Sequence, residues 1–383
     1  MKSKHLVFVL LICLASLKSN AQFSLNPAVD TIHNNNNREV IHTLFQYLNL
    51  RFNGKDGRTY WLPAEANRLK AYDFYEAHNL YQITFDDIII LGITQPEKSL
   101  FKVKVLFDYI GTDKQKTIWS ISDFYLTRYN DSLKFTNALY VNMRFNHYKT
   151  VVSNKIIYHF PYSYKYQQSK VDSANKFISA IETFFNKSIP GKIEYATAPT
   201  CESLYEILGD SYQVGTLSSS TTYCGYFDTK NKLIITSGDE FYKHELLRTI
   251  NILYPGAPDL MKSGITTLWG GSMNKPVIYH LKKLYPYLLQ HPEVLDKVDD
   301  FNYFDDETNP SFVMQAIVIN YILKHDGKAG LIKLIQSAKV DDTITGFLKD
   351  NYSITDTRGF FLKEFDFYKN RSGMEFEDIF NIK

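Results

Sequence analysis

The sequence has 383 residues and carries 43 Lys and Arg against 41 Asp and Glu, so its formal net charge at pH 7 is +2. Such a small net charge excludes a strong overall attraction to nucleic acid or to anionic membranes. The length favours two domains, each large enough to bury its own core.

The first residues predict a cleavable signal peptide. Lys2 and Lys4 precede an apolar run over residues 6–17, and a small-x-small cleavage site ends at Ala21. The run is shorter than the about 20 apolar residues that a membrane helix needs. We therefore predict residues 1–21 as a signal peptide, export to the periplasm or the cell exterior, and no transmembrane segment in the mature chain.

Two cysteines remain after this cleavage, Cys201 and Cys224. In an oxidising compartment they can form a disulfide, and they can equally be two half-buried thiols, because the sequence does not supply the geometry of the bond. Neither stands beside a histidine, so a catalytic cysteine is not predicted.

The N-terminal half, residues 22–147, is predicted as a small α+β domain. Val40, Leu44, Tyr47 and Leu48 share one face of a helix. A second helix is predicted over residues 64–78. Residues 101–109 alternate strictly between apolar and polar, as a strand does, and further strands are predicted over residues 84–91, 117–126 and 133–141. Helices followed by an antiparallel meander resemble the α+β cone of the nuclear-transport-factor type.

The C-terminal half, residues 148–383, is predicted as a second domain. The expected order is a strand, a helix, a strand, a short helix, a hairpin and then a series of helices, over residues 155–160, 169–185, 192–196, 203–208, 223–236, 276–289 and 311–325. In the helix over residues 169–185, Val171, Ala174, Ile178, Ile181 and Phe185 share one apolar face.

The hairpin leads into a segment that is close to a zinc-peptidase motif. A catalytic zinc helix has two histidines four residues apart, with a glutamate as general base beside the first. Here His244 and Glu245 are present, but Arg248 stands where the second histidine belongs. A guanidinium carries a permanent charge and offers no lone pair to a metal.

The surrounding segments resemble the gluzincin metallopeptidases, in particular their "peptidase MA-like" branch. Gly225-Tyr226-Phe227-Asp228 and the Ile-rich strand after it are similar to the edge strand of that family. The segment over residues 260–266 is similar to the one that supplies the third zinc ligand, and Ser263 occupies the place of the ligand glutamate. Phe312 stands near the place of the tyrosine that steadies the oxyanion. The resemblance implies a thermolysin/aminopeptidase-like α+β domain.

The resemblance also implies that the zinc site is degenerate. Zinc hydrolysis requires three protein ligands and an open position for water, and only His244 remains at a ligand position. The Arg248 guanidinium would repel a divalent ion by several kcal/mol, even at an effective dielectric constant of about 20. Glu245 is then a vestigial general base. His280 is predicted on a solvated helix face and His291 at a helix C-terminus, so neither is expected to rebuild the site.

The leading hypothesis is an exported pseudo-metallopeptidase that acts as a binding or scaffolding protein without a cofactor. Arg248 is the candidate contact for a peptide or another anionic ligand, although its alternative role is a local ion pair with Glu245. A second hypothesis is a weakly or fully active zinc peptidase with non-standard ligands, and a third is a purely structural envelope protein.

Overall fold

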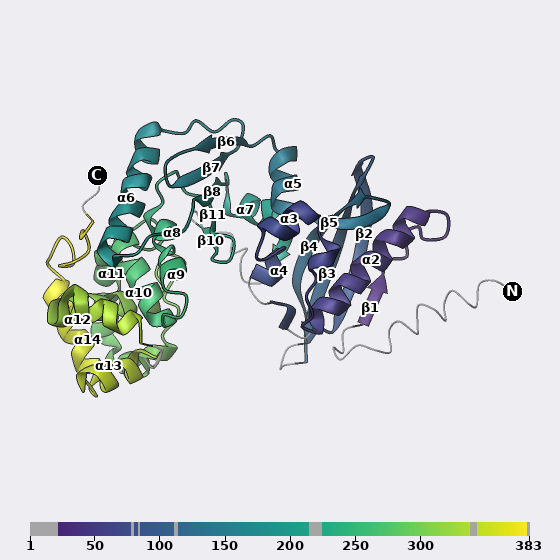
Figure 1. The fold of residues 1–383 in the computed structure, drawn as a ribbon. Helices are drawn as coiled ribbons and strands as arrows, with labels where there is room; N and C mark the ends of the chain where they lie inside the picture. The colour runs from purple at the N-terminus through teal and green to yellow at the C-terminus, as the bar shows by residue number, and fades with distance from the viewer. Residues whose placement is uncertain are drawn as a thin grey trace. The chain divides into compact units, whose positions relative to one another are not determined.

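The computed structural model describes residues 22–77, 80–82, 85–110, 114–213, 224–337 and 343–380. The predicted signal peptide, residues 1–21, lies outside this set. Backbone contacts divide the described residues into two compact units, one formed by residues 22–148 and 202–213 and the other by the remainder. Each unit combines helices with a β-sheet, so the predicted α+β class is confirmed (Figure 1). None of the described helices has the length and apolar character that crossing a membrane requires.

The first unit is built on a sheet whose strands follow one another in chain order. Four strands form an antiparallel meander, and a fifth, β1, pairs in parallel with its first strand. The strands are β1 (Gln22–Leu25), β2 (Asp87–Glu97), β3 (Leu100–Ile110), β4 (Lys116–Tyr129) and β5 (Ser132–Thr136). The alternation predicted for residues 101–109 is confirmed, because Val103, Val105 and Phe107 on β3 are fully buried.

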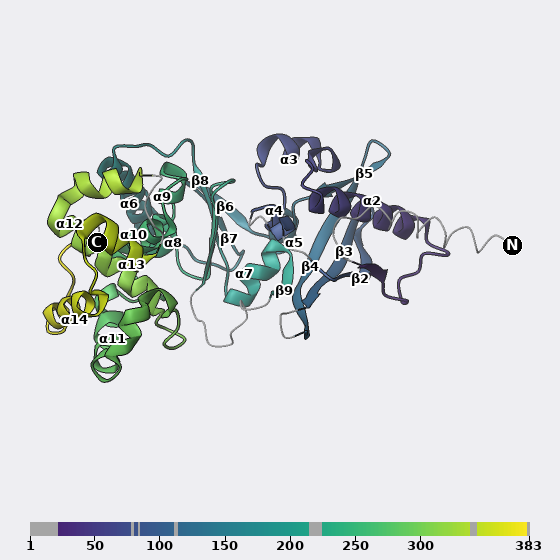
Figure 2. The same cartoon turned by 90° about the horizontal axis from the view of Figure 1, so that it is seen from below.

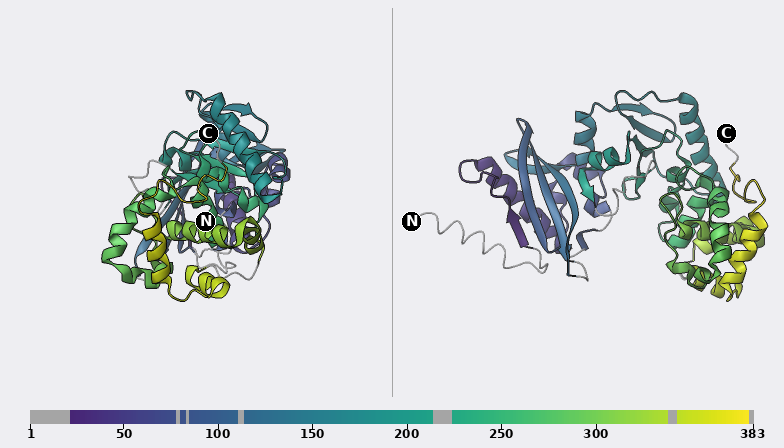
Figure 3. Two further views of the ribbon diagram at one scale, coloured as in Figure 1. Left: turned by 90° about the vertical axis from the view of Figure 1, so that its left-hand side faces the viewer. Right: turned by 180° about the vertical axis from the view of Figure 1, so that it is seen from behind.

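Helix α2 (Asn35–Phe52), the long purple helix in Figure 3, lies along one face of this sheet. Its Tyr47 meets Phe135 of β5 with ring centroids 4.5 Å apart. Helix α5 (Ala138–Phe145) packs on the other face, where Val141 contacts Leu100 and Tyr125. The unit also has helices α3 (Pro63–Arg68) and α4 (Phe74–Ala77), with short 3-10 turns η1 (Arg58–Tyr60) and η2 (Leu80–Gln82).

Two sequence predictions for the first unit are wrong in detail. The single helix expected over residues 64–78 is two short helices, because α3 ends at Leu69 in an extended conformation. The strand expected over residues 133–141 stops at Thr136, where the Asn137 side chain accepts the Leu139 N–H and starts helix α5.

A segment from the second half of the chain completes the first unit. Helix α7 (Cys201–Leu208) leads into strand β9 (Asp210–Gln213), which pairs antiparallel with β4 (Figure 2). The Asp123 N–H on β4 donates to the Gly209 carbonyl over 2.6 Å. The predicted second domain, residues 148–383, therefore wrongly includes this segment. The local pattern predicted the helix over residues 203–208 but could not show which sheet the following strand would join.

A disulfide joins Cys201 and Cys224, whose Cα atoms are 5.6 Å apart. Both cysteines belong to the second unit, and the chain between them contributes β9 to the first. Of the two alternatives left open by the sequence, the structure has the disulfide and not the two unpaired thiols.

The sheet of the second unit has the order β10-β11-β8-β7-β6, with three parallel strands in the middle and an antiparallel strand at each end. Its strands are β6 (Lys149–Val152), β7 (Ile156–Phe160), β8 (Ile193–Thr197), β10 (Gly225–Asp228) and β11 (Leu233–Thr236). Helix α6 (Gln168–Phe185) connects β7 to β8 and buries Val171, Ala174 and Ile178 in the same core as Tyr158 and Tyr195.

The rest of the second unit is helical and shares that core. Its helices are α8 (Lys243–Leu247), α9 (Ile250–Leu253), α10 (Asp259–Gly270), α11 (Val277–Gln290), η3 (Pro292–Asp300), α12 (Pro310–Ile335), α13 (Ile344–Tyr352) and α14 (Thr357–Tyr368). Helix α10 packs tightly against α12, because a Cβ at Gly264 would lie 2.6 Å from Ile319 Cγ1. Helix α12 continues past the predicted end at residue 325 and is kinked at Gly327, where φ is +62°.

Candidate functional site

The predicted motif lies on α8, directly after strand β11 and a six-residue connection. Within that connection the Thr236 hydroxyl accepts the Gly238 N–H, and the Asp239 carboxylate accepts the Phe241 N–H. Helix α8 is only five residues long, and Arg248 is its C-cap. The predicted order of strand, short loop and His-Glu helix is therefore present, with a shorter helix than expected.

A cavity of about 190 Å³ lies beside this helix. It is lined by His244, Arg248, Asn251, Asp259, Lys262, Ser263, Thr266, Thr267 and Phe312. The α10 members recur at intervals of three and four residues, which places them on one face of that helix. The structure thus brings His244, Arg248, Ser263 and Phe312 together, while Glu245 lies outside the lining of this cavity.

His244 is held in one orientation by a backbone carbonyl. Its Nδ1 lies 2.6 Å from the carbonyl oxygen of Gly271, which can only accept, so Nδ1 carries the proton of this bond. Nε2 has no hydrogen-bond partner among the described residues. Burial lowers the pKa of His244, and Arg248 also lowers it, although Glu245 and the Gly271 carbonyl act in the opposite direction. The imidazole is therefore neutral near pH 7.

Glu245 is buried behind the cavity and paired with Arg248. Its residue is 2 % exposed, and its Oε2 lies 3.2 Å from Arg248 Nε. A side chain at position 225 would overlap the Glu245 carboxylate, so Gly225 at the start of β10 makes room for it. Oε2 makes no hydrogen bond with any described residue. The ion pair expected between Glu245 and Arg248 is present.

The pairing with Glu245 uses only the Nε edge of Arg248. The two terminal nitrogens have no hydrogen bond or ion pair with any described residue, and the side chain is 39 % exposed. The two roles predicted for Arg248 are therefore compatible, since one edge of the guanidinium can hold Glu245 while the other meets a ligand.

The α10 wall adds a second cation and several hydroxyl groups. Lys262 Nζ lies 2.6 Å from the exposed carboxylate of Asp259. Thr267 is 1 % exposed, and its hydroxyl has no hydrogen-bond partner in the described part of the chain. A buried hydroxyl left in this way costs about 1–3 kcal/mol.

Sequence analysis missed Asn251, Lys262 and Thr267, which no catalytic motif marks. Thr267 lies four residues after Ser263, and Lys262 three residues after Asp259. One face of α10 could have been traced from Ser263 by that spacing, but only if the cavity had already been known.

The donor set does not fit zinc. Within the described ranges there is no group of three or more His, Cys, Asp or Glu residues that could hold a metal ion. His244 is the single imidazole in the cavity, and Arg248 presents N–H donors where a ligand would present a lone pair.

The two other histidines considered from the sequence have structural positions. His280 was expected on a solvated face, but it is fully buried, with Nδ1 3.0 Å from the Thr308 hydroxyl and Nε2 2.9 Å from the Ser272 carbonyl. His291 is the C-cap of α11, as predicted.

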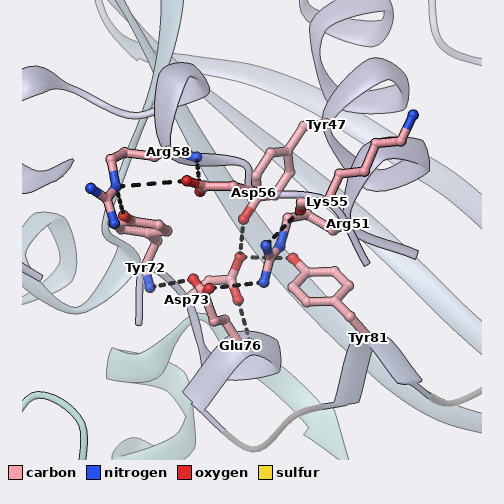
Figure 4. A network of polar contacts seen from close by, with 9 residues as sticks. All are labelled: Tyr47, Arg51, Lys55, Asp56, Arg58, Tyr72, Asp73, Glu76 and Tyr81. Carbon is pink, nitrogen blue, oxygen red and sulfur yellow. Dashed lines mark hydrogen bonds and ion pairs between the residues drawn. The ribbon is translucent and has the colours of Figure 1, made fainter. Parts of the chain in front are cut away.

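The first unit contains a second cluster of buried polar groups, centred on Asp73 (Figure 4). The Tyr47 and Tyr81 hydroxyls donate to its Oδ2 over 2.8 and 2.7 Å, and the Glu76 N–H donates to its Oδ1 over 2.8 Å. Arg51 pairs with the Glu76 side chain over 2.8 Å. Burial raises the pKa of Asp73, and these hydrogen bonds oppose the shift. Both carboxylate oxygens have partners within the protein, so this cluster serves packing.

Comparison with the models of known protein families found no match to this chain, and comparison with curated proteins found none either.

Proposed function

We propose that the chain is an exported pseudo-metallopeptidase, in which a gluzincin-like domain is kept as a binding or scaffolding module without zinc. The order of β10, β11, α8 and α10 supports this proposal, as does the cavity that joins His244, Arg248 and Ser263. A cavity with unused polar groups favours binding over a purely structural role.

The observation that carries the proposal is the position of Arg248. Its Nε lies 3.2 Å from Oε2 of the buried Glu245, and the residue lines the cavity at the place that the resemblance gives to a zinc ligand. A glutamate in that position needs a metal-bound water to deprotonate. Paired with a guanidinium, it has no such proton to take, so the cavity keeps the N–H donors of Arg248 for binding rather than a centre for hydrolysis.

Metal analysis of the full-length mature protein tests this proposal. The protein is purified without chelators, its zinc content is measured by plasma mass spectrometry, and the same preparation is incubated with a mixed peptide pool whose products are read by mass spectrometry. We expect far less than one zinc per chain and no cleavage. Stoichiometric zinc together with cleavage that disappears in Glu245→Gln would overturn the proposal, and that variant also separates true activity from a contaminating peptidase.

One observation favours the alternative of a zinc enzyme with unusual ligands. The Nδ1 of His244 is fixed by a backbone carbonyl, which is the arrangement that orients many metal-binding histidines. The alternative still lacks two further ligands among the residues around the cavity, and the same metal analysis decides it.

Export is also part of the proposal. The Cys201–Cys224 bond is of the kind that persists in oxidising compartments. Sequencing of the N-terminus of the mature protein recovered from the cell envelope or medium should begin at Gln22, and a mature chain that still begins at Met1 in the cytoplasm would contradict export.

A further inference from the structure

The cavity beside α8 has hydrogen-bond donors that are suited to one carboxylate. Arg248 offers a planar pair of terminal nitrogens, which matches the two oxygens of a carboxylate. Ser263 lines the same cavity, and its hydroxyl has no partner among the described residues. Thr267 adds a hydroxyl that is buried and unpartnered. A buried hydroxyl without a hydrogen-bond partner destabilises the empty protein, and a ligand that accepts its hydrogen bond removes that cost.

The same cavity contains one fixed acceptor. Because the Nδ1 of His244 donates to the Gly271 carbonyl, Nε2 presents a lone pair. A ligand that satisfies the cavity therefore carries an N–H or O–H donor close to its carboxylate. The last residue of a peptide has this combination in its terminal carboxylate and its own backbone N–H.

The volume of the cavity and the charges around it further restrict the class of ligand that fits. About 190 Å³ is below the roughly 300–1,000 Å³ of pockets that enclose whole small molecules, so the cavity holds about one residue. Two carboxylates, Glu245 and Asp259, already face the two cations Arg248 and Lys262. Because these charges balance, one added carboxylate leaves a single net negative charge at the site, whereas a phosphate leaves nearly two and is repelled more strongly by the two carboxylates.

We propose that the cavity binds the C-terminal residue of a peptide or protein chain, with the carboxylate on Arg248, Ser263 and Thr267 and the terminal backbone N–H on His244 Nε2. This inference rests on the proposed function, since a catalytic zinc at this position would occupy the same space.

Titration of the mature protein with acetylated tripeptides tests the proposal. The probes are acetyl-Gly-Ala-Xaa peptides with each residue at Xaa, as free acids and as matched carboxamides, measured by saturation-transfer NMR and by calorimetry. We expect at least one free acid to bind at least about tenfold more tightly than its carboxamide, because the amide leaves the guanidinium without a charged partner. Equal binding of acid and amide, or no binding of any peptide, overturns the proposal.

Sodium glucuronate and inorganic phosphate serve as competing probes. Binding of glucuronate without binding of any peptide would assign the cavity to a sugar acid and overturn the proposal, and so would a preference for phosphate. The zinc content of the same preparation is measured in parallel. A metal-free, inactive protein that fails to discriminate acid from amide refutes this inference alone, whereas zinc with cleavage refutes the proposed function.

Three variants locate the binding. Arg248→Lys keeps the charge but loses the paired nitrogens, and it should weaken binding of the free acid about tenfold. Thr267→Val should weaken binding about fivefold while the unfolding temperature of the empty protein stays level or rises, because the orphan hydroxyl is gone. Thr249→Val is the matched control, since that buried hydroxyl donates to the Leu246 carbonyl and lies outside the cavity. Unchanged binding in Thr267→Val together with weakened binding in Thr249→Val would contradict the assignment.

Discussion

The two units each bury a carboxylate beside an arginine, and they treat it differently. In the first unit Asp73 has three donors, and the neighbouring Arg51 is paired with Glu76. In the second unit Glu245 has only the Nε of Arg248 near it, and the rest of that guanidinium is unused. The difference separates a polar cluster that stabilises the fold from one that has capacity for a ligand.

Burial by itself would not have made this distinction. Asp73 and Glu245 both lie among buried aromatic and aliphatic side chains, and both are near a cation. What differs is whether the carboxylate oxygens accept hydrogen bonds inside the protein, because a buried carboxylate oxygen left without a donor costs free energy. A ligand therefore gains most binding free energy where it bonds to a polar group beside a cavity that has no partner in the protein.

The largest expected effect comes from completing the second site with a metal. The double variant Arg248→His and Ser263→Glu places three zinc ligands around the cavity, if the gluzincin alignment is right. We expect it to bind zinc at least about 100-fold more tightly than the original chain, so that a zinc excess raises the stability by roughly 2–4 kcal/mol. Thermal unfolding with and without zinc measures this effect, and each single variant is a control. A folded double variant whose unfolding temperature ignores zinc would contradict the alignment.

The next largest effect is a loss of stability, and it tests whether Asp73 and Glu245 have different structural roles. Asp73→Ala removes the acceptor of two buried tyrosine hydroxyls, and we expect it to destabilise the first unit by about 3 kcal/mol. Glu245→Gln removes a charge that has one partner, and we expect less than about 1 kcal/mol in either direction. Urea unfolding followed by circular dichroism compares the two variants. Equal losses would show that the two carboxylates have the same structural role.

The smallest effect concerns Asp210, a buried carboxyl of the first unit that, unlike Asp73, has one oxygen without a partner among the described residues. Asp210 lies on β9 and accepts from the Ser122 hydroxyl through Oδ1, so the oxygen concerned is Oδ2. Burial raises its pKa to about 8, and the nearby Asp73 and Asp123 add to the rise. The folded chain therefore holds this proton over a pH range in which the unfolded chain has released it.

The sign of the pH dependence follows from that difference. The stabilising contribution of the protonated Asp210 is complete below the unfolded pKa of about 4 and is lost as the pH rises toward 8. We expect the first unit to lose about 1 kcal/mol between pH 6 and pH 7, because one proton amounts to at most about 1.4 kcal/mol per pH unit. Asp210→Asn should flatten this slope. A slope that is unchanged in the variant would assign the pH dependence to another group.

Much of the fold follows from local patterns. The faces of α2 and α6 and the alternation of β3 were predicted because their period of 3.6 or 2 is set by which side is buried. The division between α3 and α4 and the start of α5 at Asn137 depend on single turns, for which the local preferences are weak. The pairing of β9 with β4 depends on contacts between residues about 90 positions apart, and no local pattern reports such a contact.

The site divides in the same way. The sequence predicted that His244, Arg248 and Ser263 would meet, because the resemblance assigned all three to the positions of zinc ligands in one site. It did not predict Thr267 or Lys262, whose significance comes from the cavity, nor the burial of His280, whose two hydrogen bonds join parts of the chain that are 8 and 28 residues away.

The disulfide also determines how the chain transmits tension. Once the chain is unfolded and pulled at its two ends, tension passes through the Cys201–Cys224 bond, so that the residues between the two cysteines stay outside the stretched path while the bond lasts. Reduction would release this hidden length, which for a separation of 23 residues amounts to roughly 75 Å of extended chain. An intact bond therefore limits how far the unfolded chain can be extended.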